Sequence, residues 1–107
     1  MNGRQLDRRV TIERATMIDD GFGQVESWAP LVTTWASKRD VSDAERIRAG
    51  SVSAEITTRF RLRWRSVIAT VTPKDRLVHE GRVYNIFSVK EIGRREGVEI
   101  TGAARAE

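Results

Sequence analysis

The sequence predicts a mainly β protein, a small antiparallel β-barrel or sandwich of about six to seven strands with one short helical insertion. Short segments in which apolar and polar residues alternate recur along the chain, and this is the period of a β-strand. Glycine, proline and aspartate gather between those segments and supply turns. A single stretch, about residues 38–53, breaks the pattern with a charged, helix-favouring composition.

Length and composition limit the possible classes of protein. The 107 residues suit one domain, residues 1–107, and the net charge of +4 permits contact with nucleic acid without requiring it. The absence of cysteine excludes disulfides and zinc–thiolate sites. No apolar run approaches the ~20 residues that span a bilayer, and the N-terminus lacks the apolar core of a secretory signal. We therefore expect no membrane contact and a cytosolic protein, or a particle assembled in the cytoplasm.

The clearest strand pattern lies between Ser53 and Arg65. One face of this segment carries Ile56, Thr58, Phe60, Leu62 and Trp64, and the other carries Thr57, Arg59, Arg61, Arg63 and Arg65. The first face is predicted to be in the core. The four arginines repel one another unless water, carboxylates of neighbouring strands or another molecule meets them. A solvated outer face and a face that binds a protein or nucleic acid both remain open.

Further strands are expected at residues 6–14, 24–28, 31–37, 76–79, 82–92 and 98–101. Pro30 is expected to separate the second from the third of these, and residues 103–107 to fray. Glu80 and Gly81 predict a tight hairpin turn. Residues 82–92 are apolar on both faces, which indicates either a strand covered on both sides or a bulge that switches faces. The predicted core contains Val10, Ile12, Val25, Phe60, Leu62, Trp64, Phe87, Val89 and Ile100.

Two other segments are candidates for binding. Residues 19–23 have strong turn chemistry, and Phe22 between two glycines is expected to be exposed unless a partner covers it. Ser42 to Glu45 match a capping box that predicts a helix of about two turns, ending near Gly50 and carrying Arg46 and Arg48. This insertion is either a surface crossover or a functional loop.

The sequence offers little catalytic chemistry. His79 is the only histidine and stands beside a hairpin turn, so it is predicted to be a surface or edge residue and not a zinc ligand. Asp19 and Asp20 are adjacent and diverge in a turn, which suits them poorly to acid–base catalysis. We expect a binding or structural protein, not an enzyme, with no cofactor and no metal.

Several motifs, taken in order, resemble the head–tail joining, or head-closure, proteins of tailed bacteriophages and phage-derived particles. The opening pattern is Leu6, Arg9, Val10, Thr11, Ile12 and Arg14, followed by Asp20, Gly23, Val25 and Trp28. Next come Trp35-Ala36 and the alternating arginine segment from Thr57 to Arg65. The last pieces are Val71, Thr72, Pro73, Arg76, Leu77, Gly81, Arg82, Tyr84 and Ile86. Residues 66–71 lack the proline and glycine usual in the family.

The resemblance implies a small β-barrel with a helical insertion that forms a homo-oligomeric ring, of six or twelve copies, beneath the portal. Such a ring would contact portal or adaptor proteins and tail proteins, extend the channel for double-stranded DNA without reading its sequence, and help retain packaged DNA. The protein would be located at the head–tail interface of a phage or of a gene-transfer agent. The candidate interface residues are Arg59, Arg61, Arg63, Arg65, Phe22, Arg46 and Arg48.

A second hypothesis is a monomeric β-barrel that binds nucleic acid through the arginine-rich strand. Sequence favours the ring subunit, because a net charge of +4 is low for a dedicated nucleic-acid binder. We expect the arginines to meet carboxylates of neighbouring strands or of the next subunit. The candidates are Glu13, Glu45, Glu91 and Glu99.

Overall fold

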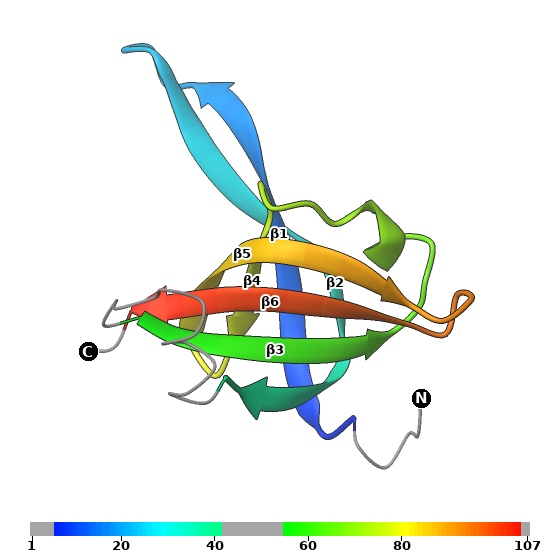
Figure 1. The fold of residues 1–107 in the computed structure, drawn as a ribbon. Coiled ribbons are helices and arrows are strands. Elements are labelled where there is room, and N and C mark those ends of the chain that lie inside the picture. The colour runs from blue at the N-terminus through cyan, green and yellow to red at the C-terminus, as the bar shows by residue number, and fades with distance from the viewer. Residues whose placement is uncertain (1–5, 42–54, 106–107) are drawn as a thin grey trace.

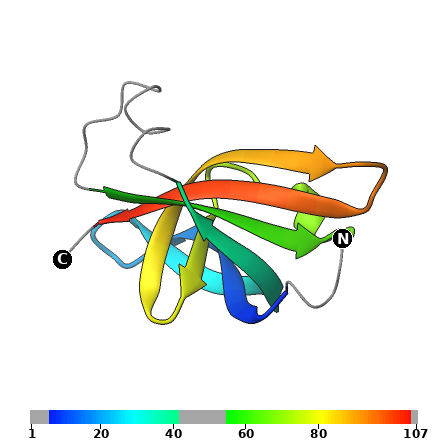
Figure 2. The same ribbon diagram turned by 60° about the horizontal axis from the view of Figure 1, so that its bottom comes forward.

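Six antiparallel strands form a closed barrel in the computed structural model, which describes residues 6–41 and 55–105. The elements are β1 (Arg8–Asp19), β2 (Gln24–Asp40), β3 (Glu55–Arg63), the short 3-10 helix η2 (Ile68–Thr70), β4 (Arg76–His79), β5 (Arg82–Ile92) and β6 (Gly97–Arg105). Neighbouring strands follow the order β1-β2-β3-β6-β5-β4, and β4 pairs with β1 to close the barrel (Figure 1). Figure 2 shows β6 running between β3 and β5. The mainly β prediction is confirmed.

The predicted helix and most of the insertion lie outside the described residues. The insertion was expected from residue 38, but β2 continues to Asp40 and pairs there with β3. The backbone amide of Val41 still donates to the carbonyl of Thr57 at 2.9 Å. None of the helices in the described part of the chain is long and apolar enough to cross a membrane.

Residues 24–40 form one long strand, so the expected break at Pro30 is wrong. Ile12 pairs with Val32, whereas the next residue of β1, Glu13, pairs with Pro30. Leu31 is therefore the extra residue of a β-bulge. A bulge leaves one position of the strand out of the hydrogen-bonded ladder, which is where proline is tolerated.

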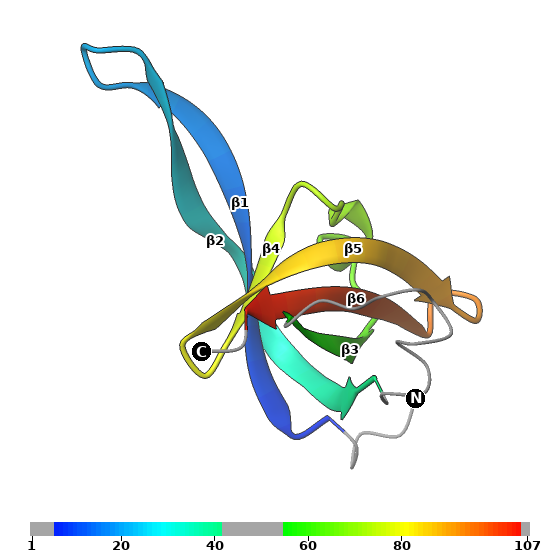
Figure 3. The ribbon, with the colours of Figure 1, turned by 60° about the vertical axis from the view of Figure 1, so that its left-hand side comes forward.

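The outer parts of β1 and β2 leave the barrel as a two-stranded arm, residues 14–29. In the described structure, β1 pairs with β4 only over Thr11–Glu13, and β2 pairs with β3 only from Ala36 onward. Beyond Glu13 the two strands pair with each other alone, and the hairpin projects from the barrel in Figures 1 and 3. The principal extents of 46 × 34 × 23 Å reflect this projection.

Contacts on both faces hold the base of the arm on the barrel. On one face, Arg14 donates to the carboxylate of Asp75 through Nε, at 3.0 Å, and through Nη2, at 3.1 Å. On the other face, Arg76 donates to Glu13 at 2.7 Å and places its guanidinium 4.2 Å from the ring centre of Trp28. These contacts fix the direction in which the arm leaves the barrel.

The barrel interior is filled mainly by aliphatic residues and two aromatic rings. Phe60 is fully buried and meets the ring of Tyr84 edge to face at 5.0 Å. Of the nine predicted core residues, Val10, Ile12, Phe60, Leu62 and Ile100 are buried, whereas Trp64 and Val89 are partly buried against the core. The buried apolar residues beyond the prediction include Val32, Ala36, Ile68, Val71, Leu77, Tyr84, Ile86, Val98, Ala103 and Ala104.

Two predicted core residues are exposed. Val25, 41% exposed, lies near the tip of the arm, where no second layer covers the strand face. Phe87, 52% exposed, is the extra residue of a bulge, because Ile86 pairs with Gly102 and Ser88 with the adjacent Thr101. The bulge turns Phe87 out to solvent between the buried Ile86 and the partly buried Val89. Of the two alternatives for residues 82–92, the bulge that switches faces is confirmed.

The β4–β5 turn and the C-terminal strand are both well ordered elements of the barrel. Glu80 and Gly81 both have positive φ, 51° and 76°, as a tight hairpin turn requires, and the β4–β5 hairpin is confirmed. The expected fraying of residues 103–105 is wrong, because β6 continues to Arg105 with Ala103 and Ala104 buried. Residues 106 and 107 lie outside the described part.

His79 is buried, so its prediction as a surface or edge residue is also wrong. Its Nδ1 lies 3.0 Å from the carbonyl oxygen of Arg9, and its ring packs against Phe60 with 5.9 Å between ring centres. The backbone pairing of β4 with β1 brings the histidine against this carbonyl. His79 therefore contributes to closing the barrel.

Candidate assembly interface

A basic surface covers the outer side of β2 and β3. Phe60 and Leu62 point into the barrel, so Arg59, Arg61 and Arg63 between and beside them point outward. Register places Arg39 of β2 opposite Arg59 and Ser37 opposite Arg61. We call the outward-facing residues Arg39, Arg59, Arg61 and Arg63 the basic face.

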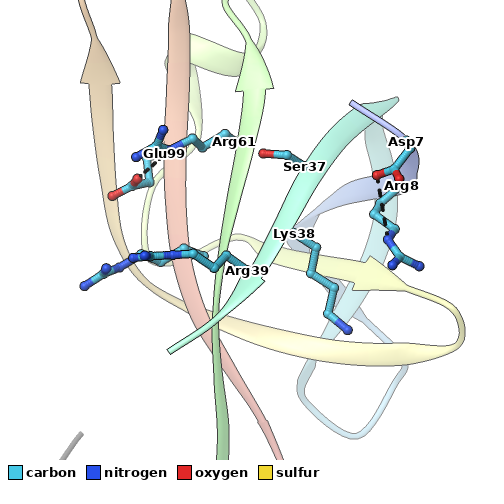
Figure 4. A pocket seen from close by; sticks show the side chains of 8 residues that line it. Asp7, Arg8, Ser37, Lys38, Arg39, Arg61 and Glu99 are labelled. Carbon is cyan, nitrogen blue, oxygen red and sulfur yellow. Dashed lines mark hydrogen bonds and ion pairs between the residues drawn. The ribbon is translucent and has the colours of Figure 1, made fainter. Parts of the chain in front are cut away.

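A shallow hollow of about 440 Å³ lies beside the basic face (Figure 4). Its lining contains five cationic side chains and two carboxylates, with Arg8 and Asp7 contributed by the start of β1 and the residue before it. The lining residues are Asp7, Arg8, Ser37, Lys38, Arg39, Arg59, Arg61 and Glu99. Among these described residues, the cationic side chains outnumber the carboxylates.

One carboxylate of β6 meets the basic face. Arg61 donates through Nε to Oε2 of Glu99 at 3.0 Å, a cross-strand pair in which the arginine side chain is about half exposed (Figure 4). An exposed ion pair contributes only ~0–1 kcal/mol to stability. Of the three other predicted carboxylate partners, Glu13 binds Arg76 instead, Glu91 makes no ion pair within the described residues, and Glu45 lies outside them. Arg63 makes no ion pair within the described part of the chain.

The tip of the arm is an ordered turn that presents an aromatic ring. The carboxylate of Asp19 accepts from the amide of Gly21, and that of Asp20 accepts from the amide of Phe22, both at 2.9 Å. Gly21 and Gly23 have positive φ, which a residue with a side chain adopts only with strain. Phe22 is 99% exposed, as expected for a phenylalanine in such a turn.

The structure separates the predicted interface residues into groups. Arg59, Arg61 and Arg63 lie together on β3, and Arg65 is exposed two residues beyond the end of that strand. Phe22 lies at the tip of the arm, away from the arginines. Arg46 and Arg48 fall outside the described residues. No group of three or more His, Asp or Glu side chains in the described ranges is arranged to hold a metal ion.

The sequence model of the phage head completion protein family matches residues 1–105, nearly the whole chain. The chain belongs to this family. The head completion protein is accordingly a structural component of a phage or phage-derived particle, with a role in completing the head. The resemblance drawn from the sequence motifs is thereby confirmed. No protein with curated annotation matches the chain in sequence.

Solved structures share the fold of the head completion protein. The solution structure of protein SF1141 from Shigella flexneri 2a has 29% sequence identity and a TM-score of 0.76, with 100% of this chain and 99% of that chain covered. A chain in the virion of a native gene transfer agent particle has 24% identity and a TM-score of 0.67, with 94% and 96% covered. The second likeness shows the fold alone.

The sequence interpretation missed an aromatic residue beside the basic face of the head completion protein. Trp35 is about half exposed on the outer side of β2, and the guanidinium of Arg9 lies 5.2 Å from its ring centre. A pocket of about 300 Å³ next to it is lined by Leu6, Thr34, Trp35 and Arg63. Val32 and Ala36 of β2 point inward, so the alternation of side chains along the strand places Trp35 on the outer side. Its position near Arg63 follows only from the register between β2 and β3.

Proposed function

We propose that this head completion protein is a structural, non-catalytic subunit that assembles beneath the portal as a ring of identical copies. The ring would extend the channel for double-stranded DNA, help retain the packaged DNA and provide the surface to which the tail attaches. Family membership supports the role in completing the head. The basic face supports the assembly, because it gathers positive charge on the outer side of the barrel and one of its members, Arg63, makes no ion pair within the described residues.

Like charges on one face of a strand repel one another unless opposite charges meet them. Arg61 and Arg63 lie two positions apart on the outward face of β3. Glu99 meets Arg61, whereas Arg63 makes no ion pair in the described part. A neighbouring subunit or the portal is therefore expected to bring a carboxylate to Arg63. Repetition around a ring multiplies the effect of each weak pair on assembly.

A charge-reversal variant tests this role. Arg61→Glu/Arg63→Glu changes two exposed residues and should leave the circular dichroism spectrum unchanged. In sedimentation and negative-stain electron microscopy with purified portal, the natural protein should form rings and this variant should bind at least about tenfold more weakly. Lys74→Glu/Arg82→Glu is the matched control, because it makes the same change in net charge at exposed positions away from the basic face.

Two results would overturn the proposal in different ways. A natural protein that stays monomeric with and without portal contradicts ring formation. A reversal variant that assembles as well as the control contradicts the role of the basic face and leaves the ring in place.

A nucleic-acid-binding barrel is the second candidate, and Trp35 is the observation that favours it. An exposed indole beside Arg9 and near Arg63 combines a stacking surface with positive charge, as in proteins that bind single strands. Phe60 and Leu62 of β3 cannot take part, because they are buried in the core.

A further inference from the structure

The tip of the arm is an apolar surface that no other described residue covers. Phe22 is almost fully exposed, and Ile18 and Val25 form an exposed cross-strand pair just behind it. Met17, on the opposite side of the arm, is also exposed. Solvent-exposed apolar residues gathered on a projecting element are typical of protein–protein contact sites.

The arm is also acidic. Residues 14–29 contain Asp19, Asp20 and Glu26, and their one cationic side chain, Arg14, is paired with Asp75 at the base. The basic face and the adjoining hollow have the opposite charge, with Arg8, Lys38 and the arginines of β2 and β3. The two surfaces are therefore complementary in charge.

These two surfaces lie at opposite ends of the same hairpin. β1 begins with Arg8 and Arg9, beside the hollow and Trp35, and its twelve residues end at the acidic turn (Figure 3). Twelve strand residues span about 40 Å, so the tip cannot fold back onto the basic face of its own subunit. A contact between two different surfaces of identical copies is heterologous, and repeating it produces a ring if the rotation closes.

We propose that the arm of one subunit docks on the basic face of the next copy of this chain, with Phe22 inserted into the pocket formed by Leu6, Thr34, Trp35 and Arg63. The pocket, at about 300 Å³, is large enough for a phenyl ring. Trp35 offers an aromatic surface and Arg63 a guanidinium for a cation–π contact. Asp19 and Asp20, on the same turn, are placed to reach the cations around the pocket.

This inference rests on the proposed function, because the contact joins two copies of the chain. It identifies the two surfaces through which neighbouring subunits of the ring would meet. The contacts at the base of the arm, Arg14 with Asp75 and Arg76 with Glu13, keep the arm extended before docking. A pre-formed arm loses little conformational entropy on binding.

Disulfide trapping tests the contact, because the sequence contains no cysteine. Gln24→Cys/Thr34→Cys keeps Phe22 in place; assembled with portal and mildly oxidised, it should give a ladder of covalent multimers up to the full ring on a denaturing gel. Gln24→Cys/Arg82→Cys is the control, since residue 82 lies in the β4–β5 hairpin outside the proposed pocket; it should give dimers at most.

Exchanging the charges of the two surfaces, so that the arm becomes basic and the basic face becomes acidic, tests the contact independently through the strength of assembly. Asp19→Lys/Asp20→Lys should weaken assembly about tenfold, and combining it with Arg61→Glu/Arg63→Glu should restore most of the loss. Phe22→Ala should weaken assembly about 10- to 30-fold with no change in the melting temperature, as expected for an interface hot spot.

The outcomes distinguish this contact from the ring itself. Rings of normal size that show no ladder and no rescue by charge exchange overturn the docking contact and leave the proposed function in place. Cross-linking of residue 24 to the portal instead of to a second copy also overturns it. A natural protein that forms no ring with portal overturns the docking contact and the ring together.

Discussion

Arg14 and Asp75 are 61 positions apart in the sequence, yet Nε of the arginine lies 3.0 Å from Oδ1 of the aspartate. The second carboxylate oxygen accepts from Nη2 of Arg14 and from the amide of Thr72, which organises the turn before β4. Hydrogen bonding to Asp75 raises the pKa of the Arg14 guanidinium, although partial burial acts in the opposite direction. The pair joins the base of the arm to the loop that precedes β4.

Asp75→Asn should therefore destabilise the protein although the two side chains have the same shape. The new amide nitrogen is a donor where Arg14 and the amide of Thr72 also donate, so at least one buried hydrogen bond is lost. The free energy of unfolding should fall by about 1–3 kcal/mol in urea denaturation. Asp20→Asn is the control, because an asparagine oxygen can still accept from Phe22 at the exposed turn; an equal loss in both variants would contradict this role of Asp75.

Phe60→Ala and Phe87→Ala remove the same side chain from opposite environments. Phe60 is fully buried against Tyr84 and His79, whereas Phe87 is half exposed in a bulge. The first change should lower the free energy of unfolding by about 3–5 kcal/mol, near the whole stability of a small domain. The second should lower it by less than about 1 kcal/mol. Similar midpoints in thermal unfolding would contradict the placement of these residues.

Gly102→Ala should disturb the pairing of β5 with β6. A Cβ atom at this position would lie 2.7 Å from the carbonyl oxygen of Asn85, which is backbone and cannot move aside cheaply. Overpacking of this kind costs about 1–3 kcal/mol, measurable as a lower urea midpoint. Ser88→Ala, at an exposed position near the same bulge, is the control. If the glycine variant unfolded at the natural midpoint, the two strands would be less closely packed than described.

Local period predicted β3, although the strand ends at Arg63 and not at Arg65, because residues 57–63 alternate between the barrel interior and its outer side. The exposure of Val25 and Phe87 could not be predicted in this way. Alternation tells which residues share a face, but not whether a second layer covers that face, and the arm has none at Val25. A bulge at Phe87 shifts the faces of β5, and its position depends on the pairing with Gly102 and Thr101.

The candidate interface was predicted in part for the same reason. Arg59, Arg61 and Arg63 follow from the period of one strand. Trp35 was missed as a member of this surface because its position beside Arg63 depends on the register between β2 and β3, which the sequence does not encode locally. The burial of His79 likewise depends on a contact with the carbonyl of Arg9, 70 positions away.

The isolated protein should bind DNA only weakly. A channel through which a duplex slides requires walls that do not hold it, and the family role in head completion requires no base recognition. We expect weak binding of duplex and single-stranded DNA at physiological salt in gel-shift assays, with little change in Arg61→Glu/Arg63→Glu or Trp35→Ala.

The salt dependence decides between this expectation and the nucleic-acid-binding barrel. Each phosphate that an arginine neutralises in a duplex adds about −0.9 to the slope of log K against log salt. Arg61 already has the carboxylate of Glu99 at 3.0 Å, so a phosphate has to compete with a partner built into the fold. Tight binding by the natural protein, with a steep slope lost on arginine reversal and single-strand affinity lost in Trp35→Ala, would make the basic face a nucleic-acid site instead of a subunit interface.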